Sequence, residues 1–180
     1  MSVTVDATVG GAAANSYLSV ADAGTLLNNR LGIDAWTAAS TDDKGRALIM
    51  ATMEIDSLPL SGFKMSSTQA LMFPRTTQVE ATDQIPVQIQ RACAAQALWA
   101  LQHSATGGRS ERQQLIAEGV TQYTIGSLSE NLRGAGAAAN LCGEAQRHLR
   151  GWISRLGTTI GPREESIYGY TGWNSGPFAP

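Results

Sequence analysis

The sequence predicts a mainly α-helical fold: a small helical bundle around a central alanine-rich helix, with a short β-hairpin and an extended C-terminal tail. Three observations carry this prediction. Residues 85–104 gather apolar side chains on one half of a helix. Residues 120–125 are rich in β-forming side chains between two glycines. Residues 157–180 hold five glycines and three prolines, a composition that argues against regular structure.

The chain is expected to have three parts. An N-terminal arm covers residues 1–15, a helical core covers residues 16–156 with its hairpin at about 120–132, and a partner-binding tail covers residues 157–180. A chain of 180 residues is long enough for one domain with a substantial core. The alternation around Val3–Val5 leaves two possibilities for the arm, a short edge strand or a flexible segment.

Two helices are predicted in the first third of the chain. Ser19 is a suitable N-cap for a helix over residues 20–31, and a second helix runs over about 41–58. Trp36 is expected to fill the gap between two helices. The second helix is apolar on two sides, so it is expected to be buried from two directions, within the fold or against a partner. The residues of these surfaces are Val20, Ala23, Leu27 and Leu31 on the first helix, and Ala47, Leu48, Ala51, Ile55 and Leu58, then Ile49, Met50 and Met53, on the second.

The remaining core is predicted as a loop and two further helices. In the irregular stretch 59–84, Leu71 and Phe73 are expected to pin a loop that leaves Arg75 exposed. On the central helix, Gln96 and Trp99 fall on the polar half. Another segment of the chain could cover Trp99, or this residue could lie at a subunit interface, where tryptophan is enriched. The last helix is predicted to run to about residue 156.

The sequence contains no pattern of residues that indicates a catalytic site. His103 and His148 are the chain's two histidines, and neither has the partners of a metal site or a catalytic pair. Cys93 and Cys142 fall on apolar helix faces and are expected to be buried free thiols. No phosphate-binding glycine motif occurs. We therefore expect a protein that is not an enzyme, with no catalytic residues, no metal and no cofactor.

Charge and hydropathy also restrict the function. A net charge of −2 gives no general basis for binding nucleic acid. No apolar run approaches the ~18 residues of a membrane span, and the N-terminus lacks the features of a signal peptide, so synthesis in a cytoplasm is expected. The last helix carries Arg147, Arg150 and Arg155 opposite its apolar face. They could be solvated, form ion pairs between subunits, or contact phosphates.

The tail combines a flexible composition with aromatic side chains, a combination that suits folding upon binding. Linkers without a binding role are usually poor in aromatic residues. Its candidate partner-binding residues are Ile167, Tyr168, Tyr170, Trp173 and Phe178.

Two stretches carry a resemblance to a known family. Residues 15–23 read NSYLSVADA, and residues 68–75 read TQALMFPR, with Trp36 in a turn between them. This pattern, followed by a long alanine-rich helix after a short Ile-Pro start, resembles the head-to-tail adaptor proteins of tailed phages, some of which are labelled DnaT-like single-stranded-DNA-binding proteins. The resemblance covers about residues 12–156. Gly24-Thr25 departs from it, since relatives tend to have an acid or alanine and an aromatic there.

The resemblance implies a structural virion protein in the neck, between capsid and tail, assembled in the host cytoplasm. Such subunits form a ring, usually a dodecamer, which docks on the portal protein after DNA packaging. The ring extends the DNA channel without sequence-specific binding and provides a platform for the downstream connector, stopper or tail protein. The tail would reach the portal, while Trp99, Tyr123, Arg147, Arg150 and Arg155 are candidates for contacts between subunits. The alternative function is a single-stranded-DNA-binding module that uses the three arginines.

Overall fold

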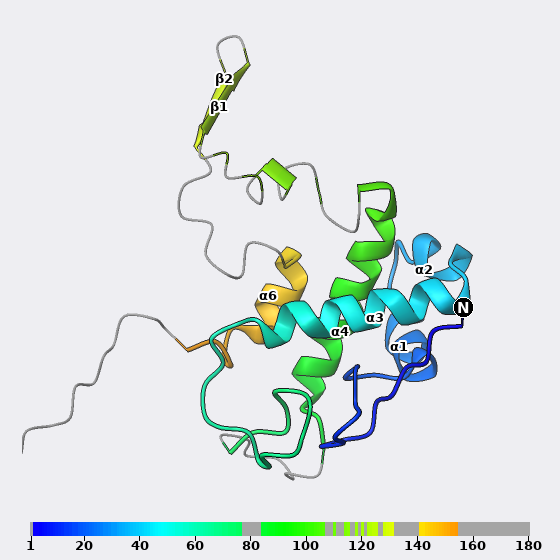
Figure 1. The fold of residues 1–180 in the computed structure, drawn as a ribbon. Helices are drawn as coiled ribbons and strands as arrows, with labels where there is room; N and C mark the ends of the chain where they lie inside the picture. The colour runs from blue at the N-terminus through cyan, green and yellow to red at the C-terminus, as the bar shows by residue number, and fades with distance from the viewer. Residues whose placement is uncertain are drawn as a thin grey trace, which may run out of the picture.

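The computed structural model describes residues 2–76, 84–106 and 141–154 and, between the last two ranges, residues 110, 114–115, 118, 120, 122–125 and 128–131. The described part of the chain is mainly helical, as the sequence predicts (Figure 1). Its helices are α1 (Val20–Leu27), α2 (Asp34–Ala38), α3 (Thr41–Asp56), α4 (Val87–Gln102) and α6 (Gly143–Leu149). Arg155 and the predicted tail, residues 157–180, lie outside the described residues.

Helix α4 is the centre of the bundle, and α3 and α6 make the most extensive contacts with it. Most of the predicted apolar half is buried, including Ile89, Cys93 and Leu98, while Val87 and Leu101 are partly buried. The burial extends further than predicted, because Ala92, Ala95 and Gln96 are also covered. The alanines leave little side chain on this helix, so neighbouring helices approach it from several directions.

Helix α3 follows the predicted pattern closely. The Ser40 side chain accepts a 3.1 Å hydrogen bond from the Asp43 N–H and so caps the first turn. All five members of the predicted main stripe are buried. On the second apolar side, Ile49 is half-buried, whereas Met50 and Met53 are 39% and 67% exposed. The described residues therefore cover one of its two apolar sides.

Helix α1 is shorter than predicted. It ends at Leu27, and the expected stripe residue Leu31 is 97% exposed. The chain turns here because the Arg30 N–H bonds to the Leu27 carbonyl and Gly32 adopts a positive φ of 74°. This turn leads into α2, whose Trp36 is buried as predicted.

The last helix is also shorter than predicted, ending at Leu149 instead of about residue 156. The following backbone pairs with the segment after α3: the Ser154 N–H donates to the Pro59 carbonyl at 2.7 Å, and the Ser61 N–H donates to the Trp152 carbonyl at 2.8 Å. These contacts draw the chain away from the helix axis. The predicted apolar-face residue Cys142 instead precedes the helix and caps it, accepting from the Ala145 N–H at 3.4 Å.

The N-terminal arm does not form the edge strand that was one of its two predicted states, since residues 2–15 contain no strand, and a hydrogen bond joins the arm to the core. The Val3 N–H donates to Asp42 at 3.2 Å, and Asn15 bonds the backbone of Thr4 and Asp6. A Cβ at Gly45 would lie 3.0 Å from a methyl group of Val5. Glycine at this position lets the arm cross α3 closely.

Within the predicted hairpin range, β1 (Gln122–Ile125) and β2 (Leu128–Asn131) pair antiparallel. The register sets Gln122 opposite Asn131 and Ile125 opposite Leu128. Tyr123, a predicted inter-subunit residue, belongs to β1 and lies opposite Glu130.

Candidate functional site

The residues that carry the family resemblance meet inside the core. The Tyr17 hydroxyl donates to one carboxylate oxygen of Asp56, and the Met72 N–H donates to the other at 3.1 Å. The Phe73 N–H in turn donates to the Tyr17 hydroxyl at 3.3 Å. Burial raises the pKa of Asp56 above its usual range. Burial, with the Asp56 charge as the second cause, also raises the pKa of Tyr17. This polar cluster joins the first motif to the second.

Arg75 is buried, so the prediction that it is exposed is wrong; its exposed fraction is 5%. Its guanidinium donates to the carbonyls of Leu60, Ser61, Gly62 and Met72, with the Ser61 contact at 2.7 Å. These loop carbonyls lack partners from a regular helix or sheet, and buried carbonyls require donors. The planar guanidinium has five N–H groups and supplies several of them at once. Burial lowers the pKa of Arg75 from its ordinary value.

Gln69, another motif residue, forms hydrogen bonds with the backbone inside the loop of residues 60–76, called loop 60–76 below. Its amide nitrogen donates to the Leu71 carbonyl at 2.8 Å and to the Pro74 carbonyl at 3.1 Å, while its oxygen accepts from the Ser66 N–H at 3.0 Å. The backbone also pairs across the loop, with the Thr76 N–H donating to the Phe63 carbonyl at 2.9 Å. The motif therefore fixes the conformation of loop 60–76.

Loop 60–76 nevertheless presents large apolar side chains to solvent. Phe63 is 80% exposed and Met65 is 43% exposed. We treat Phe63 and Met65 as one candidate contact surface, and the exposed Met50 and Met53 on α3 as a second. Exposed apolar side chains on an ordered loop are typical of positions that contact a partner.

A groove between α1, α4 and α6 combines apolar and charged side chains. Its volume is about 450 Å³. Leu26, Leu27 and Ala94 contribute apolar lining. Its charged and titratable lining residues are Arg30, Arg91, Glu144 and His148.

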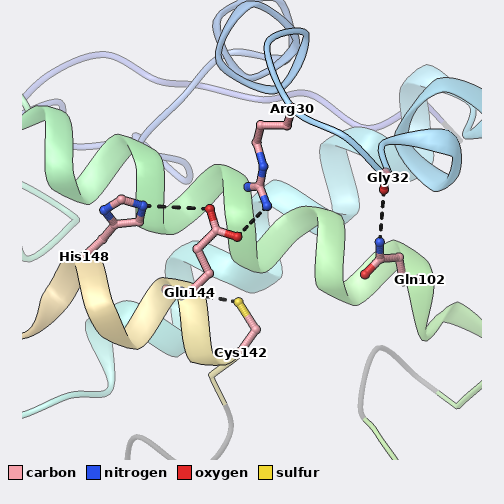
Figure 2. Close-up of polar contacts among 7 residues, drawn as sticks. Arg30, Gly32, Gln102, Cys142, Glu144 and His148 are labelled. Atoms are coloured by element: carbon pink, nitrogen blue, oxygen red, sulfur yellow. Dashed lines mark hydrogen bonds and ion pairs between the residues drawn. The ribbon is translucent and has the colours of Figure 1, made fainter.

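Glu144 is the centre of the charge network in this groove (Figure 2). One carboxylate oxygen pairs with the Arg30 guanidinium, and the other lies 3.9 Å from His148 Nε2. Desolvation lowers the pKa of His148, and nearby Arg91, Arg147 and Arg30 lower it further, while Glu144 opposes them. The turn that follows α1 and carries Arg30 makes a further contact: the Gly32 carbonyl accepts a hydrogen bond from the Gln102 side-chain amide at 3.2 Å.

The residues predicted to contact a neighbouring subunit belong to different elements of the structure. Arg147 and Arg150 are exposed on or just after α6. Trp99 is partly buried against the core and stacks at a tilt on His103, with ring centroids 4.0 Å apart. Its indole Nε1 is buried and has no hydrogen-bond partner among the described residues. Packing from its own chain covers part of Trp99, and its contact with a neighbouring subunit stays a prediction.

The two thiols are buried and free, as predicted. Burial raises the pKa of Cys93 to about 11 and also raises the pKa of Cys142. Within the described ranges, no group of three or more His, Cys, Asp or Glu side chains could hold a metal ion. The same residues include no helix that is long and apolar enough to cross a membrane.

These features define a small, mainly helical domain whose sequence motifs stabilise its own interior and whose surface carries exposed apolar and basic side chains. Residues 1–159 match the family described as "Putative DnaT-like ssDNA binding protein". The chain belongs to this family. No curated protein and no solved structure matches it.

Proposed function

We propose that this chain is the subunit of a ring-shaped head-to-tail adaptor in a tailed-phage virion. The ring would dock on the portal after DNA packaging, extend the DNA channel and provide the platform for the downstream connector or tail protein. The observation that carries this proposal is the contrast between buried and exposed side chains in loop 60–76. Its motif residues Gln69 and Arg75 are buried, while Phe63 and Met65 are exposed.

The two exposed apolar surfaces suit a ring. In a cyclic ring each copy contacts its two neighbours through different patches, so one subunit needs two separate contact surfaces. Met50 and Met53 on α3 supply one candidate, and Phe63 and Met65 on loop 60–76 supply the other. Methionine and aromatic side chains are both enriched in interfaces. We assign the supporting charged contacts between subunits to the exposed Arg147 and Arg150.

Portal attachment is assigned to the C-terminal tail, through its aromatic residues and Ile167. A segment rich in glycine and proline can fold on a partner surface, and aromatic side chains supply large contact areas. Deleting residues 158–180 is therefore expected to leave the core folded and to abolish portal attachment. Completion of infectious heads by the truncated chain would contradict this assignment.

The ring contacts are tested by replacing Met53 and Phe63 with serine in a full-length chain that complements the phage. We expect the double variant to fold but to lose the neck ring in electron micrographs of purified particles. Leu31→Ser is the matched control, because Leu31 is 97% exposed and lies outside both surfaces. Intact rings in the double variant, or absence of the chain from wild-type necks, would overturn the proposal.

The family description favours a second candidate, a single-stranded-DNA-binding module. This function predicts binding to an oligothymidylate that weakens steeply with salt, because arginines would displace counterions from phosphates. Replacing Arg147, Arg150 and Arg155 with glutamine would reduce the salt dependence. Fluorescence anisotropy of a labelled oligothymidylate at low salt measures this binding, and a lack of binding under these conditions excludes the single-stranded-DNA-binding function.

A further inference from the structure

We propose that the groove between α1, α4 and α6 is the docking site for an acidic and aromatic segment of the same chain, residues 164–170. This docking concerns the chain before portal attachment, when Ile167, Tyr168 and Tyr170 are not bound to the portal, and it does not depend on the ring function. The occupant is inferred from the charge of the groove, from its apolar lining and from the place where the tail leaves the core.

The charges of the groove are not balanced by the described residues. Glu144 is engaged by Arg30, with His148 on its other side. Arg91 lines the same groove and Arg147 acts on His148 from α6, and neither forms an ion pair with a described residue. The groove lining thus holds two arginines, Arg30 and Arg91, and a single carboxylate, Glu144, while Arg147 lies close enough to His148 to affect its charge. A docked carboxylate would interact favourably with these arginines, because a guanidinium group is only weakly hydrated by water.

The lining also favours an apolar neighbour beside the carboxylate. Leu26 is partly buried and lines the groove together with Leu27 and Ala94. A free inorganic anion would leave this surface without a partner. A peptide with adjacent acidic and aromatic residues would occupy both parts of the groove at once.

The chain contains such a segment close to the groove in sequence. Glu164 and Glu165 are adjacent acids, and Ile167, Tyr168 and Tyr170 follow within five residues. Ser154 lies just beyond α6, which forms one wall of the groove. Nine residues lie between Ser154 and Glu164, and the ten chain steps from one to the other span roughly 33 Å when extended. A helix of seven residues such as α6 is only about 10 Å long. The acids can therefore reach the groove without disturbing the core.

His148 provides a direct readout of docking in the full-length chain. The charged groups around it are Glu144 and Arg147 on α6, Arg91 on α4 and Arg30 after α1. Two additional carboxylates nearby would favour its protonated form. We expect the double substitution Glu164→Gln and Glu165→Gln to lower the His148 pKa by about half a unit, as measured by NMR titration. His103, the chain's other histidine, does not line the groove and is the internal control.

A charge exchange tests the contact itself. Arg91→Glu should release the segment. The NMR resonances of the tail should then shift in the same direction as they do in the Glu164→Gln, Glu165→Gln variant. Combining Arg91→Glu with Glu164→Arg and Glu165→Arg should restore docking. Failure of this rescue, together with an unchanged His148 in the glutamine variant, would overturn the proposal.

Two other outcomes would assign the groove to a different occupant. If the His148 shift disappears on tenfold dilution, the segment comes from a neighbouring copy, and intramolecular docking is wrong. If an oligothymidylate raises the His148 pKa while the glutamine substitutions have no effect, the groove is a nucleic-acid site. The absence of the chain from phage necks would overturn the ring proposal alone and leave this one standing.

Discussion

Two regions of the molecule use arginine in opposite ways. In loop 60–76, Arg75 is buried and its guanidinium is enclosed by backbone carbonyls. In the α1–α4–α6 groove, Arg91 is exposed and forms no ion pair with a described residue. The first arrangement stabilises a loop, whereas the second leaves charge available for a partner. The location of an arginine, and not its presence in a motif, therefore distinguishes a structural arginine from one that stays exposed in this fold.

The largest expected effect tests the structural side of this comparison. Arg75→Ala removes several charge-assisted hydrogen bonds and leaves buried carbonyls without donors, so we expect a loss of about 3–5 kcal/mol in the free energy of unfolding. Urea denaturation measures this loss. Arg91→Ala is the matched control and should unfold at nearly the wild-type urea concentration. Equal losses in both variants would remove the distinction between the two regions.

A smaller loss is expected for a buried amide on α4. Gln96 donates to Glu54, and its oxygen accepts from the Cys142 N–H at 2.7 Å. Gln96→Leu leaves this N–H without its acceptor, at a cost of about 1–3 kcal/mol. The exposed Gln88 on the same helix provides the control substitution Gln88→Leu. A Gln96→Leu protein as stable as this control would show that the amide is not needed for α6 packing.

The smallest effect is a change of stability with pH at Asp56. Because burial raises its folded pKa above the unfolded value, the folded state holds this proton more tightly. Its contribution to stability is present below the unfolded pKa and is lost as pH rises through the folded pKa. The stability of the wild type relative to Asp56→Asn should therefore fall between pH 4 and pH 7. Urea denaturation at both pH values measures it, and an advantage that grows with pH would contradict the assignment.

Much of the helical core could be predicted from the sequence because local rules decide it. The apolar stripe of α3, its Ser40 cap and the burial of Trp36 follow from periodicity and from capping chemistry. The ends of α1 and α6 could not be predicted in this way. The helix after Cys142 stops early because Ser154 bonds Pro59, a residue distant in the sequence.

The candidate site was harder to predict than the fold. The exposed Arg147 could be recognised from the polar face of its helix. The groove depends on a contact between Arg30 and Glu144, which lie 114 residues apart in the sequence. Helical periodicity also placed Gln96 on a solvent face, although it is 1% exposed. Periodicity separates polar from apolar side chains, but it does not reveal which polar groups find partners inside the core.

The buried thiols limit how copies of this chain can be joined. At pH 7 a thiol with a pKa of about 11, such as Cys93, is ionised in roughly one molecule in 10,000. Cys142 is also buried, and its sulfur accepts a hydrogen bond at the start of α6. Covalent cross-linking through cysteine would require the helices to separate first. Disulfide bonds between copies are therefore not expected while the core of each copy is intact.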